Sequence, residues 1–132
     1  MSKLKSPDPN RGRKFAAPAE APNFDQQPPA FCFRYLVKGY GIEDCNDQEK
    51  VSLADTLWQL SQRRWLDLIM SSRHGSGCEK INNLKVPRPP AIPEDVSYLA
   101  FRFHKMAPMV GFREGRMFHI LWLDRSFTVY KH

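Results

Sequence analysis

The feature that most constrains the fold lies in the C-terminal third of the chain, where apolar and polar residues alternate over several short runs. Alternation with a period of two is typical of β-strands that bury one face. Only a few residues separate the runs, which favours antiparallel hairpins with turns at Glu114-Gly115 and Arg125-Ser126. The strands are expected near residues 98–104, 109–113, 116–123 and 127–131.

The middle of the chain has a helical pattern instead. Leu53, Leu57 and Leu60 recur at helical spacing, and a second set that starts at Trp65 does the same within residues 50–71. The phase of the pattern slips between the two sets, so we expect a helical hairpin in which Ser61 caps the second helix.

Other segments complete an α+β domain. The aromatic alternation of residues 31–36 predicts an N-terminal strand. Residues 72–97 are expected to form a loop, because four prolines within seven residues exclude a helix or a central strand. The predicted domain, residues 31–132, is therefore a strand, a helical hairpin and a four-stranded antiparallel sheet.

Residues 1–30 are expected to be a disordered basic arm. They contain six of the 11 prolines and too little apolar surface to offset the entropy of ordering. The arm is interpreted either as a tail that touches nucleic acid or as a solubilising extension.

The charge and the cysteines limit which partners, cofactors and compartment are expected for this chain. A formal net charge of +6 favours an anionic partner, most often a nucleic acid and less often a membrane surface or an acidic protein. Three scattered cysteines argue against a disulfide framework and for the cytoplasm. His74 and Cys78 lack a second pair with ligand spacing, so neither a metal nor another cofactor is expected. No apolar run approaches the ~20 residues of a membrane span.

Two-residue turns would fix the register of the sheet, placing Arg113 opposite Arg116 and Val110 opposite His119. One face would then pack on the helices through Phe118, Ile120, Trp122, Phe127 and Val129, joined by Leu99, Phe101 and Phe103. The other face would carry Arg102, His104, His119, Thr128, Tyr130 and His132, with Arg34 added from the first strand.

This second face predicts RNA cleavage. Attack by a 2′-hydroxyl needs a base, an acid and a cation for the phosphorane, and histidine and arginine supply these roles near neutral pH. Tyr130 would donate a proton or stack on a base. The alternative interpretation is that His119 is a hydrogen-bonded core histidine.

Three segments, Leu99–His104, Val110–Gly115 and Met117–Asp124, resemble the small bacterial and phage toxins of the RelE/YoeB-like family. The resemblance implies an endoribonuclease that cuts mRNA, commonly on the ribosome, and is restrained by a cognate antitoxin protein. Gly111-Phe112-Arg113 and Tyr130-Lys131-His132 resemble features of that family, which implies catalytic roles for Arg113, Tyr130 and His132. The predicted catalytic residues are Arg102, Arg113, His119, Tyr130 and His132, and the predicted RNA contacts are Arg34, Arg73, His74, His104 and Arg116.

Two other functions fit the same basic face. A non-catalytic nucleic-acid-binding module would use the face together with the arm. A protein-directed inhibitor would use it against an acidic partner, and the fold alone does not choose between these functions.

Overall fold

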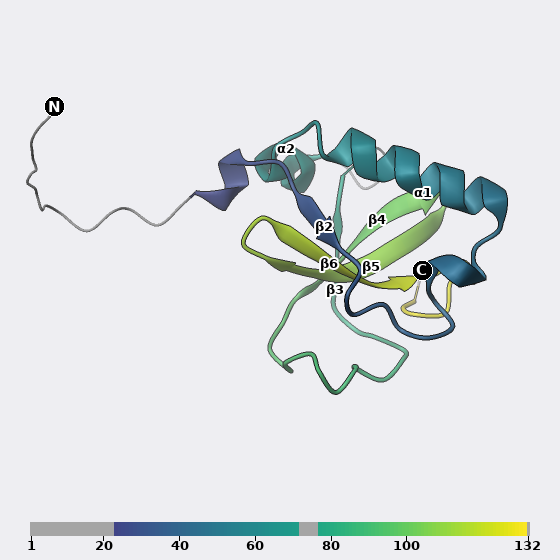
Figure 1. Ribbon diagram of the computed structural model, residues 1–132. Helices are drawn as coiled ribbons and strands as arrows, with labels where there is room; N and C mark the ends of the chain where they lie inside the picture. The colour runs from purple at the N-terminus through teal and green to yellow at the C-terminus, as the bar shows by residue number, and fades with distance from the viewer. Residues whose placement is uncertain (1–22, 72–76, 132) are drawn as a thin grey trace, which may run out of the picture.

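The computed structural model describes residues 23–71 and 77–131. Two helices lie over one face of a five-stranded mixed sheet, and a long loop lies on the other side (Figure 1). The strands follow one another across the sheet in the order β2-β6-β5-β4-β3. Their bounds are β2 Ala30–Cys32, β3 Glu79–Ile81, β4 Tyr98–His104, β5 Ala107–Glu114 and β6 Met117–Leu123.

The α+β class and the β4-β5-β6 meander agree with the sequence prediction, whereas the four-stranded antiparallel sheet is wrong in part. The short strand β2 pairs with β6 in parallel, as the long connection between them allows: both helices and strands β3 to β5 lie between β2 and β6 in the sequence. The three-residue strand β3 lies inside the segment that was expected to be all loop, and it pairs antiparallel with β4.

The predicted fourth strand, residues 127–131, does not form. The buried carboxylate of Asp124 instead accepts hydrogen bonds from the backbone N–H groups of Thr128 and Val129, at 2.8 and 2.9 Å. Phe127 has a φ of 59°, which belongs to the left-handed region. The segment is therefore a loop, and the one isolated β-bridge among the described residues joins its Tyr130 to Leu84.

The predicted helical hairpin is present as α1 (Asp47–Leu60) and α2 (Trp65–Met70). Asn46 and Glu49 form a reciprocal capping box at the start of α1. Ser61 does not cap α2: it ends α1, and its hydroxyl donates to the carbonyl of Trp58 at 2.6 Å.

The turn of the β5–β6 hairpin lies one residue later in the chain than predicted, which changes the pairing of the two strands. The turn is Gly115-Arg116, so Arg113 faces Phe118 and His119 faces Phe112. A register shift beside Gly111 then inserts one extra residue into β6. A Cβ atom on Gly111 would lie 1.9 Å from the carbonyl oxygen of His119, so the close approach of the two strands there requires glycine.

The shift moves Trp122 from the helix face, where it was predicted, to the opposite face. Val129 also lies on that opposite side, and Phe127 is 42% exposed, because neither residue belongs to a strand. Phe118, Ile120, Phe101 and Phe103 pack against the helices as predicted, with Leu99 half-buried beside them.

The face away from the helices is not open. The proline-rich strap, which we define as residues 82–97, packs on it through Ile92, Val96 and Val86. The loop of residues 35–40 covers it from the β6 side through Tyr35, Val37 and Tyr40. The sheet is therefore buried between the helices and these two loops, and each side has its own apolar core.

Contacts with the domain begin before the predicted boundary at Phe31. The 3₁₀ turn η1 (Phe24–Gln26) lies beside α2, and the carboxylate of Asp25 pairs with Arg113 at 2.6 Å. The carbonyl of Gln27 accepts from the backbone N–H of Trp65 at 2.9 Å. Residues 23–30 are therefore part of the domain, and the rest of the predicted arm lies outside the described residues. Neither α1 nor α2 has the length and hydrophobicity of a membrane span.

Candidate functional site

The structure places three of the predicted catalytic residues on the predicted face but not in one cluster. Arg102, His119 and Tyr130 all lie on the strap side of the sheet. His119 on β6 pairs with Phe112 on β5, and Phe112 pairs with Tyr98 on β4. Arg102 lies four residues after Tyr98 along β4. Strand rise and strand spacing put the Cα atoms of His119 and Arg102 about 16 Å apart. One phosphate group cannot contact both side chains.

Arg113, predicted to be catalytic, lies on the helix side and has structural partners. Its guanidinium donates to Asp25 at 2.6 Å and to the carbonyl of Gly115 at 2.7 Å. It also stacks over the indole of Trp65, 4.4 Å from the ring centroid. These contacts hold the N-terminal turn and α2 against the β5–β6 hairpin.

Two other predicted RNA contacts also have structural partners. Arg116 donates to the carbonyl of Pro28 at 3.2 Å, next to the start of β2. His104 leaves the predicted face, because the register shifts between Arg102 and His104, and its Nδ1 lies 2.8 Å from the hydroxyl of Ser52 on α1.

Arg34 does not join the sheet face either, because β2 ends at Cys32 and Arg34 lies in the exposed turn that follows. Its guanidinium stacks on the ring of Tyr35 at 5.6 Å. The predicted residues Arg73, His74 and His132 lie outside the described residues.

His119 is held in an aromatic environment. Its ring stacks on Phe112 with the centroids 4.7 Å apart, and Tyr35 packs beside it at 5.5 Å. Nε2 lies 3.1 Å from a carboxylate oxygen of Glu114, and Nδ1 is buried without a hydrogen-bond partner among the described residues. The packing favours the alternative interpretation of a core histidine, although a hollow of about 330 Å³ adjoins the ring.

The cluster that can carry acid–base chemistry lies at the β3 side of the sheet. Glu79 on β3 is paired with Ala100 on β4, and Arg102 follows two residues later on the same face. The Tyr130 hydroxyl donates to a carboxylate oxygen of Glu79 at 3.4 Å. Glu79, Arg102 and Tyr130 line one notch together with Gly77 and Pro108.

The ionisation of Tyr130 follows from these neighbours. Burial of the phenol, and then the charge and hydrogen bond of Glu79, raise the pKa of Tyr130 to about 12, although Arg102 opposes the shift. The phenol is therefore neutral at physiological pH and donates a hydrogen bond to Glu79. Glu79 is the complementary acceptor, and Arg102 is the nearby cation.

Sequence reasoning identified Arg102 and Tyr130 but not Glu79. The residue lies in a strand of only three residues, within a segment whose prolines predicted a loop. The one signal was local: Glu79 and Ile81 flank Lys80 in an alternating pattern too short to be distinguished from a loop.

The described residues contain no group of three or more metal-ligating side chains. No protein-family model matches the chain, and no curated protein or solved structure matches it either. No relative therefore assigns the toxin family, or a role, to any residue of the site.

Proposed function

We propose that the protein is an endoribonuclease of the toxin kind, with Glu79, Arg102 and Tyr130 at its active site. The observation that supports the proposal is the convergence of a carboxylate, a guanidinium and a neutral phenol on one notch at the edge of the sheet. The three groups match the base, the phosphate-binding cation and the proton donor that RNA cleavage requires.

Each group has one role in the proposed reaction. Glu79 takes the proton of a ribose 2′-hydroxyl, and the 2′-oxygen attacks the adjacent phosphorus. The bond from phosphorus to the 5′-oxygen breaks, and the leaving oxygen receives a proton. The products are a 2′,3′-cyclic phosphate and a free 5′-hydroxyl. Arg102 binds the phosphorane oxygens, for which its planar guanidinium has matching geometry.

Tyr130 has two roles in this scheme. Its phenol donates a hydrogen bond to Glu79 in the free protein, and it also lies in the same notch as the reacting groups. It orients the carboxylate, and it is a candidate acid for the leaving oxygen. His132 follows it by two positions in the sequence and is the second candidate acid.

The shape of the notch restricts how RNA binds. Its internal volume is about 10 Å³, which holds about one water molecule and no nucleotide. The scissile phosphate must therefore lie across the mouth of the notch, against the partly exposed side chains of Glu79 and Arg102.

The test uses purified full-length protein, structured and unstructured RNA, and translating ribosomes. We expect cleavage with cyclic-phosphate ends, and we expect Glu79→Gln and Arg102→Lys each to reduce the rate by on the order of 10²–10³. Tyr130→Phe should reduce the rate, and His132→Gln separates the two candidate acids. Lys80→Gln is the matched control, because Lys80 is exposed and adjacent to Glu79 in the sequence.

An intact RNA substrate in all these assays with wild-type protein would refute the proposal. Normal cleavage by folded Glu79→Gln would refute the assignment of the base. The non-catalytic alternative predicts RNA binding that changes with charge alone, so that Arg102→Lys binds as tightly as wild type and no variant has cleavage to lose.

A further inference from the structure

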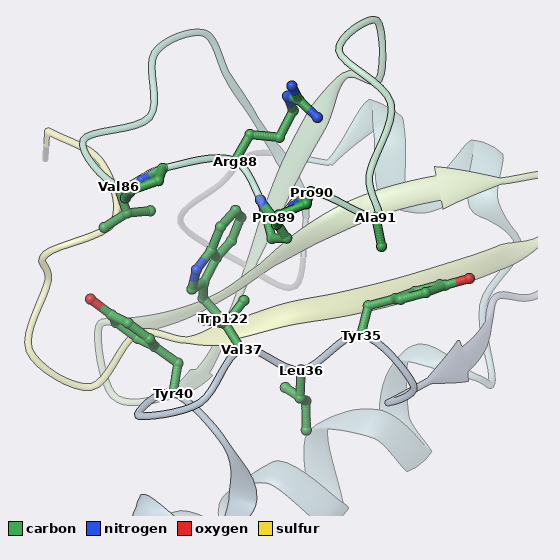
Figure 2. Close-up of a pocket in the computed structure, with 11 residues that line it drawn as sticks. Tyr35, Leu36, Val37, Tyr40, Val86, Arg88, Pro89, Pro90, Ala91 and Trp122 are labelled. Carbon is green, nitrogen blue, oxygen red and sulfur yellow. The ribbon is translucent and has the colours of Figure 1, made fainter.

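An apolar groove lies between the strap and the loop of residues 35–40, on the strap side of the sheet (Figure 2). Its volume is about 500 Å³, within the range of sites that hold small organic ligands. Trp122 lies between the two walls, and Tyr35 and Tyr40 stand on the side of the 35–40 loop. The aromatic groove is lined by Tyr35, Leu36, Val37, Tyr40, Val86, Pro87, Arg88, Pro89, Pro90, Ala91 and Trp122.

The walls of the aromatic groove are held in place before any ligand arrives. The hydroxyl of Tyr40 hydrogen-bonds that of Thr128 at 3.0 Å, and the backbone N–H of Val37 donates to Leu121 on β6 at 2.8 Å. The opposite wall is built from prolines, whose fixed φ angles limit its motion. A ligand that stacks on these rings therefore loses little energy to ordering the protein.

Positive charge surrounds the aromatic groove. None of the described residues that line it is acidic, and its wall includes Arg88, which pairs with Glu94 at 3.4 Å. Arg34, Lys38 and Lys85 are exposed, and each is the sequence neighbour of a lining residue. Aromatic rings with cations around them match the two parts of a single-stranded nucleic acid, the base and the phosphate.

The position of the aromatic groove agrees with this ligand. Trp122 is paired with Val110, Val110 with Ala100, and Ala100 with Glu79, so one row of residues crosses the sheet from the groove to the notch. Three strand spacings make the distance about 14 Å. The strap covers Val110 and Ala100 in this row, so a few nucleotides of one RNA strand would span the distance by running over the strap.

From these contacts we infer that the aromatic groove is a base-binding subsite for single-stranded RNA. This inference rests on the proposed function, because it concerns the same substrate. One base stacks on Tyr40 and a neighbouring base on Tyr35, beside Arg34 and His119. The flanking phosphates pair with Lys38 and Lys85. The subsite holds a nucleotide a few positions from the phosphate that lies at Glu79.

The test measures binding apart from cleavage. The probe is a fluorescent 2′-O-methyl RNA 12-mer, which lacks the attacking hydroxyl, and fluorescence anisotropy gives the Kd at several salt concentrations. Tyr35→Leu and Tyr40→Leu should each weaken binding roughly five- to hundredfold, the effect of losing one stacked base. Trp58→Leu is the control, because Trp58 is 63% exposed on α1, on the other side of the sheet.

The charges give a second, independent measurement. Replacing Lys38 and Lys85 together by Gln should reduce the magnitude of the salt slope by about 1.4, because each lost phosphate contact changes the slope by about 0.7 for a single strand. The tyrosine variants should keep the wild-type slope. Lys50→Gln on the exposed side of α1 is the matched charge control.

The outcomes separate this inference from the proposed function. Glu79→Gln should bind the probe at least as tightly as wild type does, because it removes a negative charge beside the phosphate. Lost cleavage without weaker binding in this variant therefore concerns the notch alone. If both tyrosine variants bind the RNA probe with the wild-type Kd, the inference is wrong and the groove is a site for a protein partner instead. An equal loss of affinity in Trp58→Leu would also overturn it. Thermal unfolding of every variant confirms that the losses do not come from unfolding.

Discussion

Replacement of Asp124 by Ala should destabilise the protein more than any surface substitution. The side chain is fully buried, and its carboxylate accepts from the backbone N–H groups of Thr128 and Val129 and, at 3.3 Å, from the Thr128 hydroxyl. These bonds shape the loop that carries Tyr130 to the notch. Without the carboxylate, two backbone donors lose their acceptor at a buried position.

The expected magnitude follows from the two backbone bonds. A hydrogen bond to a charged group contributes about 1.5–3 kcal/mol, so the loss of both should cost about 3–6 kcal/mol. Most domains of this size have about 5–15 kcal/mol of stability, so the variant should still fold in the absence of denaturant. Asp124→Asn keeps one carbonyl oxygen and should lose about half as much.

Urea unfolding followed by tryptophan fluorescence measures the effect on the full chain. With a slope of about 2 kcal/mol per molar urea, the midpoint of Asp124→Ala should fall by about 2 M. Asp95→Ala is the control, because Asp95 is exposed in a turn of the strap and should change stability by less than about 0.5 kcal/mol. A loss below about 1 kcal/mol in Asp124→Ala would refute the structural role of the carboxylate.

Three further predictions concern other contacts. Arg113→Lys should lower the midpoint of thermal unfolding but keep the cleavage rate of the folded protein, and a rate loss as large as that of Arg102→Lys would contradict its structural role. The hydrogen bond from the backbone N–H of Asn46 lowers the pKa of Glu49, so its stabilising effect should be present above pH ~5 and be lost at lower pH. Glu49→Gln should therefore differ less from wild type in thermal midpoint at pH 3 than at pH 6, and a constant difference would contradict this cause. Gly111→Ala should cost about 1–3 kcal/mol in urea unfolding, because the new Cβ collides with the His119 carbonyl, and an unchanged midpoint would show that the strands can separate freely.

Much of the fold could be predicted because its signals are local. The period of two in β4, β5 and β6 and the helical spacing of α1 and α2 depend on neighbouring residues alone. The same alternation placed Arg102 on the correct face of the sheet. The +6 charge likewise comes from composition and requires no knowledge of the fold.

The rest depends on contacts between distant segments. The parallel pairing of β2 with β6, and the pairing of β3 with β4, have no local signature in strands of three residues. The extra residue in β6 arises where Gly111 lets two backbones meet, and it turns Trp122 to the other face. Only the tertiary structure therefore brings Glu79 to Arg102 and forms the aromatic groove over Trp122, because each results from the pairing of segments that are far apart in the chain.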